Sequence, residues 1–382
     1  MKLNVGLISP SPMWEQMLLQ EGVPSNRVEL NRGDPGCSVL VVNRVLQHSE
    51  RKAVEAYLSS GGAVLGFAGH LAGVCKTTSR AARIDFLTSD VTGIFSDIHL
   101  LDLAISGEVP REANCLRTRH NEFAAYAGKL GGGYAVILPF DIAGMMEDRR
   151  AVVKSFYSTR DRLPTERVSA VSKGELRHVL HYALRYLHHV RNLPYVHVWY
   201  FPDGKKNVSA FRIDSDKGTK KEVDELYHLA VMNDFSMTWF VDVKSHEEWL
   251  HHFAFLAGQE IGVHCYEHRT FDSFDENLKN ISKAKRKLEL AGISSPGFAA
   301  PFGIWSVELA KAVDKLVFEY SSEFSYAYDT FPFYPSVDGQ TFLTPQIPVH
   351  PICIGSLRKV GYTGQQMKEY FKRVIDEKLL RD

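Results

Sequence analysis

The stretch VSAFRIDSD (208–216) decides the fold of the second half of this 382-residue chain. It has the pattern of a β-strand in which Arg212, Asp214 and Asp216 occupy alternate positions, so their side chains should point to one side. Downstream, further strands are predicted at 238–243, 260–264, 297–301, 319–324 and 346–350. Helical patterns lie between them, and a helix is predicted at 364–379. Repeated parallel units of this size predict a distorted (β/α) barrel with its site at the carboxyl ends of the strands.

Polar side chains occur where such a site should lie. Asp214 and Asp216 end the first strand, His264 and His268 lie at the end of EIGVHCYEH, and His350 ends QIPVH. His264 and His268 are the only pair among 16 histidines spaced four residues apart, which on a helical turn places two imidazoles on one face. Two imidazoles and one carboxylate can bind a cation and leave positions open for water and substrate, which is typical of a catalytic metal site.

Each of these features also has a simpler explanation. An HxxxH pair can arise by chance in a histidine-rich chain, and Asp216, before Lys217 and Gly218, could be a helix N-cap. The ordered set at successive strand ends favours the metal site.

The segment 192–382 resembles the polysaccharide deacetylase (NodB-homology) family, whose fold is a distorted (β/α) barrel. The family's ordered motifs are a paired-aspartate motif, an HxxxH motif, a third strand motif, a hydrophobic motif and a late histidine. They correspond here to RIDSD (212–216), HCYEH (264–268), AAPFG (299–303), SSEFSYAYD (321–329) and IPVH (347–350).

The resemblance implies a role for each matching position. Asp214 would be the general base and His350 the general acid. Asp216, His264 and His268 would bind a divalent metal, by default Zn²⁺, although Co²⁺, Ni²⁺ and Mn²⁺ also occupy such sites. One wall of a groove and two apolar faces for a sugar ring would come from Pro301, Phe302, Gly303, Trp305 and Tyr326.

Two positions depart from the family pattern. Ala299 stands where members usually have an arginine that pairs with the base, and the acids read DSD rather than DD. Arg212 lies two residues before Asp214 and therefore on the same strand face. We expect Arg212 to take over the missing role through a charge-assisted hydrogen bond to Asp214; the alternative is that Arg212 pairs with another carboxylate.

The first half, residues 1–191, predicts a separate α/β domain. Apolar strands at 3–8, 38–43, 63–68 and 134–138 alternate with helical patterns, which indicates a flavodoxin-like parallel sheet covered on both faces. The half resembles class I glutamine amidotransferase-like domains. The turn Gly66–Gly73 contains no cysteine or serine nucleophile and Cys75 lies beyond it, so we expect a non-catalytic domain used for binding, docking or homo-oligomer formation.

A long helix, 172–190, should end this domain. It carries four histidines, at His178, His181, His188 and His189, but no two are spaced four apart. Its leucine stripe favours a packing helix over a metal site.

The composition excludes some partners. Lysine plus arginine equals aspartate plus glutamate at 45 each, so we expect no nucleic-acid partner. The five cysteines are odd in number and widely spaced, which favours reduced thiols. Neither a secretory signal nor a membrane span is apparent, and we expect a cytoplasmic protein.

These observations predict a metal-dependent carbohydrate deacetylase that removes an acetyl group from an N-acetylated sugar or polysaccharide precursor, in surface polysaccharide biosynthesis. Two alternatives stay open: a related hydrolase acting on a non-carbohydrate amide, and an inactive carbohydrate-binding or scaffold protein.

Overall fold

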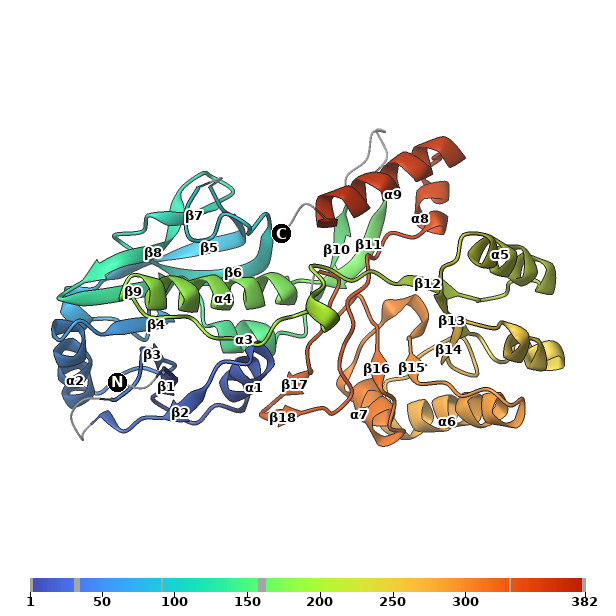
Figure 1. Cartoon of the computed structure of the whole chain (residues 1–382), viewed down its shortest axis with the longest axis horizontal. Coiled ribbons are helices and arrows are strands. Elements are labelled where there is room, and N and C mark those ends of the chain that lie inside the picture. Colours follow the sequence, from blue (N-terminus) through green and yellow to red (C-terminus); the bar gives the residue numbers. More distant parts are fainter. Residues whose placement is uncertain (1–2, 31–34, 91, 157–162, 330, 380–382) are drawn as a thin grey trace.

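The computed structural model describes residues 3–30, 35–90, 92–156, 163–329 and 331–379. Two sheets with their helices lie at opposite ends of an elongated molecule (Figure 1). No helix in the described part of the chain is both long and apolar enough to cross a bilayer.

The first half is built on a nine-stranded mixed sheet. Its parallel part contains, in spatial order, β2 (Ser25–Arg27), β1 (Val5–Leu7), β3 (Val39–Val42), β4 (Ala63–Phe67) and β9 (Gly133–Leu138). The sheet continues through antiparallel strands: β8 (Phe123–Leu130), β7 (Cys115–Thr118), β5 (Ser79–Thr88) and β6 (Leu101–Pro110).

The expectation of a purely parallel flavodoxin-like sheet is therefore corrected. The parallel strands were predicted because they are continuous apolar runs, as in VLVV of β3, all four residues of which are buried. The antiparallel strands mix buried and exposed positions, as β6 does over LDLAISGEVP, and one-sided strands of this kind lack the continuous apolar signal.

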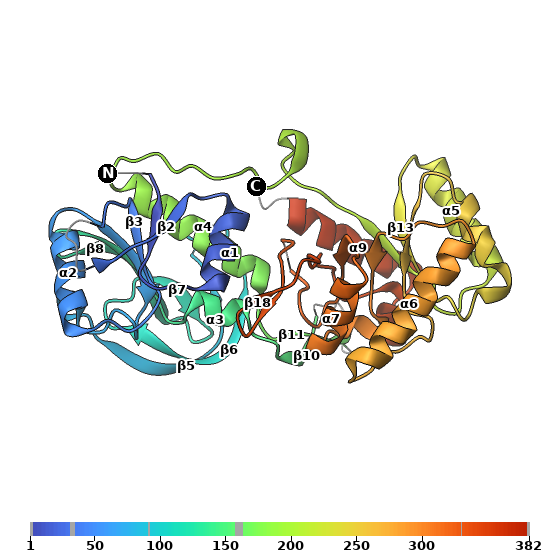
Figure 2. The same cartoon turned by 90° about the horizontal axis from the view of Figure 1, so that it is seen from below.

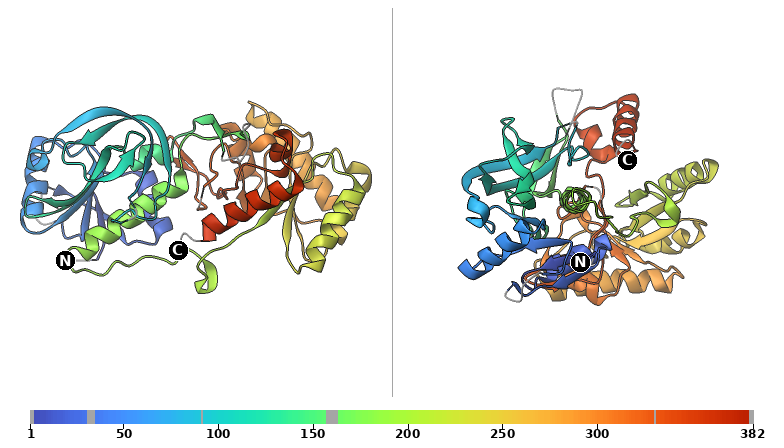
Figure 3. Two further views of the ribbon diagram at one scale, coloured as in Figure 1. Left: turned by 90° about the horizontal axis from the view of Figure 1, so that it is seen from above. Right: turned by 60° about the vertical axis from the view of Figure 1, so that its left-hand side comes forward.

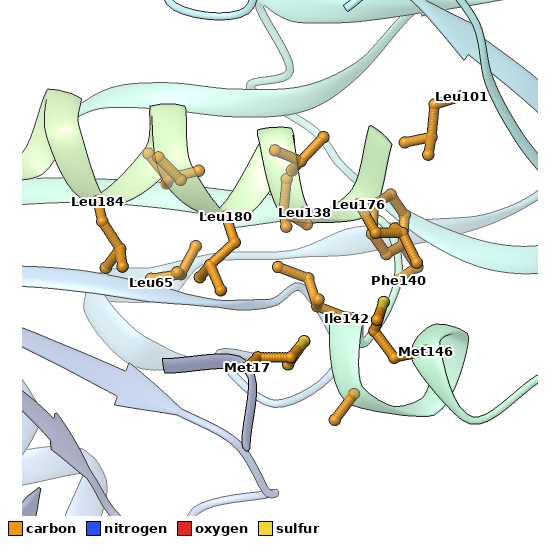
Figure 4. Close-up of a cluster of buried hydrophobic side chains, with 14 of the residues drawn as sticks. Met17, Leu65, Leu101, Leu138, Phe140, Ile142, Met146, Leu176, Leu180 and Leu184 are labelled. Atoms are coloured by element: carbon orange, nitrogen blue, oxygen red, sulfur yellow. The ribbon is translucent and has the colours of Figure 1, made fainter. Parts of the chain in front are cut away.

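Among the described residues, four α-helices and the 3₁₀ helix η2 (Val74–Lys76) accompany this sheet; the α-helices are α1 (Pro12–Glu21), α2 (His48–Ser59), α3 (Ile142–Met146) and α4 (Lys173–His189). The predicted packing role of α4 is confirmed, because Leu176, Leu180 and Leu184 are at most 1% exposed. They pack with Leu65 and Leu138 of the central strands (Figure 4).

Two connecting pieces lie between the halves. A hairpin pairs β10 (Ala151–Ser155) with β11 (Thr165–Ser169). After α4 the chain turns back as a segment without regular structure, which contains the short 3₁₀ helix η3 (Pro202–Gly204). Figures 2 and 3 show this segment running along the first half before it enters the second.

The second half is a curled parallel half-barrel of five strands in chain order: β12 (Phe211–Asp214), β13 (Met237–Val241), β14 (Glu260–Val263), β15 (Gly297–Phe298) and β16 (Tyr320–Ser321). The crossovers contain α5 (Lys220–Met232), the 3₁₀ helix η4 (Glu247–Phe255), α6 (Phe274–Leu290), the 3₁₀ helix η5 (Pro301–Gly303) and α7 (Val307–Lys315). A small hairpin of β17 (Ser336–Val337) and β18 (Gln340–Thr341) follows. After it come the helices α8 (Ile354–Lys359) and α9 (Gly364–Leu379).

The late strand expected at 346–350 does not form as a strand. Gln346 alone makes isolated bridges, parallel to Ser321 and antiparallel to Phe333. The proline at 348 lacks a backbone N–H and interrupts ladder pairing there.

The C-terminal segment also contributes to the first core. Tyr326, Ala327 and Phe333 are buried in the same cluster as the helices and strands of the first half. The buried ammonium group of Lys173 at the start of α4 donates to the carbonyl of Tyr326 at 3.2 Å. The predicted boundary at 191/192 lies between the two sheets along the chain, but side chains from both sides of it share one core, so the division into two domains stays a prediction.

Candidate metal centre

The parallel register brings the two predicted ligand segments together. β13 lies between β12 and β14; Asp216 lies two residues beyond the carboxyl end of β12, and His264 comes directly after the end of β14. The backbone N–H of Ser215 donates to the carbonyl of Phe240, and that of His264 donates to the carbonyl of Val241. Both ligand segments are therefore held against the same end of β13.

Asp216, His264 and His268 form a compact triad. Asp216 Oδ1 lies 3.0 Å from His268 Nε2 and 3.5 Å from His264 Nε2. The two Nε2 atoms are 3.2 Å apart. One carboxylate oxygen and two imidazole nitrogens at these separations suit the ligand set of a divalent transition metal.

The triad is fixed on one side and open on the other. His264 is 1% exposed, whereas the side chain of Asp216 is 58% exposed. The Nδ1 atom of His264 hydrogen-bonds the carbonyl of Ala299 at 2.7 Å, which leaves Nε2 to face Asp216. A hydrogen bond from the second ring nitrogen to a carbonyl is the usual way in which a protein orients a metal-binding histidine.

Arg212 and Asp214 form a bidentate ion pair beside the triad. Arg212 Nε lies 2.6 Å from Asp214 Oδ1, and Nη2 lies 2.8 Å from Oδ2. The guanidinium is itself held by a 2.7 Å hydrogen bond from Nη1 to the carbonyl of Ser322. The contact expected from the sequence is thus present, and a cation reaches Asp214 although position 299 is alanine.

The charges at the site favour ionised acids. Burial raises the pKa of Asp214, but the neighbouring Arg212 outweighs it, so the pKa lies below its ordinary value. Burial likewise raises the pKa of Asp216, and hydrogen bonds from His264 and His268 bring it well below the usual range. The hydrogen bond to Asp216 in turn raises the pKa of His268. Both carboxylates are therefore available as base or ligand near neutral pH.

Three further residues support the site and were missed from the sequence. Asp242 follows β13 and is 1% exposed, with one oxygen that has no hydrogen-bond partner among the described residues. Ser215 Oγ accepts a hydrogen bond from the backbone N–H of Asp242 at 3.0 Å and lies 2.9 Å from His246 Nε2. The strand-end rule that singled out Asp214 also covers Asp242, whereas nothing local marks Ser215 or His246.

A cavity of about 430 Å³ adjoins the triad. Asp242 and His268 line it together with Lys217, Lys244 and Arg269. His268 is the member of the triad that lines this space, and Glu267, which also lines it, forms ion pairs with Lys244 and Arg269.

The predicted groove residues divide into two groups. Phe302 is 66% exposed, and its ring meets the ring of His268 edge-on at 5.0 Å, while Pro301 and Gly303 are buried. Tyr326 is 1% exposed and stacks on Trp305 with ring centroids 3.9 Å apart. The expectation that Tyr326 offers a face to a sugar is corrected, because Trp305 and the first core cover the ring.

His350 has its contacts in a different cluster. Its Nε2 atom lies 3.0 Å from the hydroxyl of Tyr370 in α9, and its ring packs edge-on against Phe156. Neither neighbour belongs to the triad, so the role of His350 as general acid stays a prediction.

Cys75, beyond the glycine-rich turn of the first half, is partly buried. Burial and the nearby Glu55 raise the pKa of its thiol. A raised pKa reduces the thiolate fraction on which cysteine nucleophilicity depends.

The sequence matches no protein-family model and no curated protein. Among solved structures, the chain is similar to a protein from Mycobacterium smegmatis assigned as a polysaccharide deacetylase, with 19% identity and a TM-score of 0.38 over 47% of this chain and 76% of that one. It is also similar to a CE4 family pseudoenzyme from Bacillus anthracis, with 16% identity and a TM-score of 0.29 over 55% and 85% of the two chains. A third similar structure is a family 4 carbohydrate esterase from Streptomyces lividans in complex with acetate, with 13% identity and a TM-score of 0.29 over 43% of this chain and 90% of that one. None of these matches supports the amidotransferase-like resemblance of the first half.

Proposed function

We propose that the second half of the chain is a metal-dependent hydrolase that removes an acetyl group from an N-acetylated sugar or glycan precursor. The observation that carries the proposal is the juxtaposition of the Asp216, His264 and His268 triad with the Arg212–Asp214 ion pair. Metal-assisted amide hydrolysis combines a cation that polarises the carbonyl and activates water with a separate base. The two neighbouring groups offer both functions without sharing a residue.

The donor set fits a divalent metal. The three ligand atoms come within 4.8 Å of one another, and the backbone of Ala299 orients His264. When bound, such a cation lowers the pKa of a water molecule and polarises the acyl carbonyl. Zinc is the default for this ligand set, and Co²⁺, Ni²⁺ and Mn²⁺ share its preferences.

Asp214 is suited to take a proton. Its carboxylate is not one of the three ligands of the triad. The side chain is 33% exposed, and Arg212 holds both carboxylate oxygens in one orientation. A base in a fixed orientation contributes typically ~10²–10⁴-fold in rate. Arg212 is therefore a positioning residue that acts through Asp214, and it compensates for the alanine at 299.

The substrate surface beside the triad supports a sugar ligand. Phe302 exposes an aromatic ring next to His268, and aromatic faces provide a large apolar contact for ring carbons. The leaving amine needs a proton donor, for which His350 stays our sequence-based candidate. A non-carbohydrate amide would use the same base and ligands, and a panel of substrates separates the two.

The experiment is acetate release from a panel of N-acetylated sugars, nucleotide-linked sugars and simple cyclic amides, with zinc or cobalt added to chelator-treated protein. We expect metal-dependent release from at least one sugar. D214N should keep its metal at the triad and lose turnover, whereas H264A should lose both.

Two results would contradict the proposal. One is turnover by D214N equal to that of the wild type. The other is folded wild-type protein that takes up no metal at the triad and releases no acetate, which would favour the inactive scaffold.

A further inference from the structure

A second cluster of metal-type side chains lies far along the chain from the first. Glu21 is the last residue of α1, His181 lies in the middle of α4, and His197 lies in the segment that follows α4. Their ligand atoms all come within 4.8 Å of one another. Glu21 Oε1 and His181 Nδ1 are 2.7 Å apart.

The carboxylate of Glu21 is buried with part of its bonding capacity unused. Glu21 is 1% exposed, and its Oε2 atom has no hydrogen-bond partner among the described residues. The ion-pair partners of Glu21 are His181, on Oε1, and Arg177, whose Nη2 atom lies 3.8 Å from Oε2, beyond hydrogen-bond length. Buried charges in proteins are normally paired or coordinate metals.

His197 is oriented as a metal-binding histidine usually is, while His181 Nδ1 already contacts Glu21. His197 Nδ1 hydrogen-bonds the carbonyl of Val198 at 2.8 Å, which leaves Nε2 without that constraint. The rings of His181 and His197 meet edge-on, with centroids 4.8 Å apart, and Tyr195 stacks on His197. Carbonyl hydrogen bonds and packing of this kind fix the ring position of metal ligands.

Two phenols complete the surroundings. The hydroxyl of Tyr195 lies 3.2 Å from Glu21 Oε1, and that of Tyr200 lies 2.8 Å from His181 Nδ1 and also contacts Glu21. The backbone N–H of Val198 donates to the carbonyl of Glu21 at 3.1 Å. The segment after α4 is thus already fastened beside the cluster.

We propose that Glu21, His181 and His197 form a second site for a divalent transition metal such as Zn²⁺ or Co²⁺, which ties the segment after α4 to α1 and α4. One carboxylate and two imidazoles are the donors that zinc accepts, and the phenol oxygens lie where further ligands or hydrogen-bond partners are needed. The site is separate from the triad of Asp216 and does not depend on the proposed hydrolase activity.

The competing explanation is a hydrogen-bond network alone. Burial raises the pKa of Glu21, but hydrogen bonds from His181 and Tyr200 outweigh it, so the carboxylate is ionised at neutral pH in either case. Burial and the charge of Glu21 raise the pKa of Tyr200 and keep it a neutral donor. A bound metal has to displace the protons that form hydrogen bonds between these groups. The affinity for the metal should therefore fall with decreasing pH.

The test uses the full chain and cobalt as the probe, since Co²⁺ absorbs visible light when bound to nitrogen and oxygen ligands. We expect two equivalents bound by the wild type, one by H264A, one by H197A and none by the double variant. His189→Ala is the matched control, because His189 is an exposed histidine on α4, the helix that carries His181. This variant should bind two equivalents. E21Q keeps the size of the side chain and should also bind one.

A structural readout separates a specific site from adventitious uptake. Zinc should slow limited proteolysis of the segment 190–201 in H264A, and it should have no such effect in the H264A/H197A double variant. Cobalt that stays bound to the folded double variant would overturn the proposal, and so would failure of folded H264A to bind any. Wild-type protein that binds one equivalent, retained in H264A and lost in H197A, would support this site and contradict the triad instead.

Discussion

Replacing Arg212 with methionine removes the cation at Asp214 while keeping a long side chain. The pair has two hydrogen bonds, at 2.6 and 2.8 Å. A hydrogen bond to a charged group contributes ~1.5–3 kcal/mol, and we take the lower value because the side chain of Asp214 is 33% exposed. Two such bonds correspond to ~3 kcal/mol, or roughly a 100-fold loss in kcat/KM if they serve only to orient the base.

The assay is kcat/KM for acetate release as a function of pH, with metal content measured in parallel. Burial raises the pKa of Asp214 and Arg212 lowers it further than burial raises it. In R212M the pKa should therefore rise, and because the base acts as a carboxylate, the acid limb of the profile should move to higher pH. R212K, which keeps the charge without the bidentate geometry, should lie between R212M and the wild type.

Arg286→Met is the matched control, since Arg286 is exposed on α6, and it should match the wild type. An R212M enzyme with full metal content, kcat/KM within threefold of the wild type and an unshifted acid limb would refute the positioning role.

Three other perturbations separate stability from function. Burial raises the pKa of Glu323 from 4.5 to about 7. The folded state therefore holds this proton more tightly than the unfolded state does. The free energy of unfolding should fall by at most ~3 kcal/mol as the pH rises from 4.5 through 7. E323Q should lack this dependence in urea unfolding at pH 5 and 8, and an unchanged slope would contradict it. Tyr326→Ala should destabilise the fold by ~3–5 kcal/mol, because it removes a fully buried ring; a loss below ~1 kcal/mol would show that the ring is not packed as described. Phe302→Ala should leave stability within ~0.5 kcal/mol, since the ring is 66% exposed, and should raise KM for a sugar substrate; an unchanged KM would remove Phe302 from the substrate surface.

The triad could be anticipated because its geometry follows from local rules. Asp216 comes just after the end of one parallel strand and His264 just after another, and strand ends in a parallel sheet converge. His268 was predicted from its four-residue spacing to His264 on a helical turn, but residues 264–268 form a bend without helical structure and Cys265 has a φ of 66°, so the pair converges for a different reason from the one expected. The Arg212–Asp214 contact follows from strand alternation alone.

The rest depends on contacts between distant segments. The motif around Tyr326 predicts an exposed aromatic side chain. The ring is covered because the C-terminal segment packs into the core of the first half. His181 reads as a packing residue on α4, because its partner Glu21 is 160 positions away. The antiparallel strands of the first half escaped detection because at least half of the residues in each strand are partly or fully exposed.

A crystal of the zinc-loaded protein, measured on both sides of the zinc absorption edge, tests the central claim most directly. We predict an anomalous peak within ~2.0–2.2 Å of Asp216 Oδ1, His264 Nε2 and His268 Nε2. Ordered side chains at these three positions with no peak between them would contradict the account.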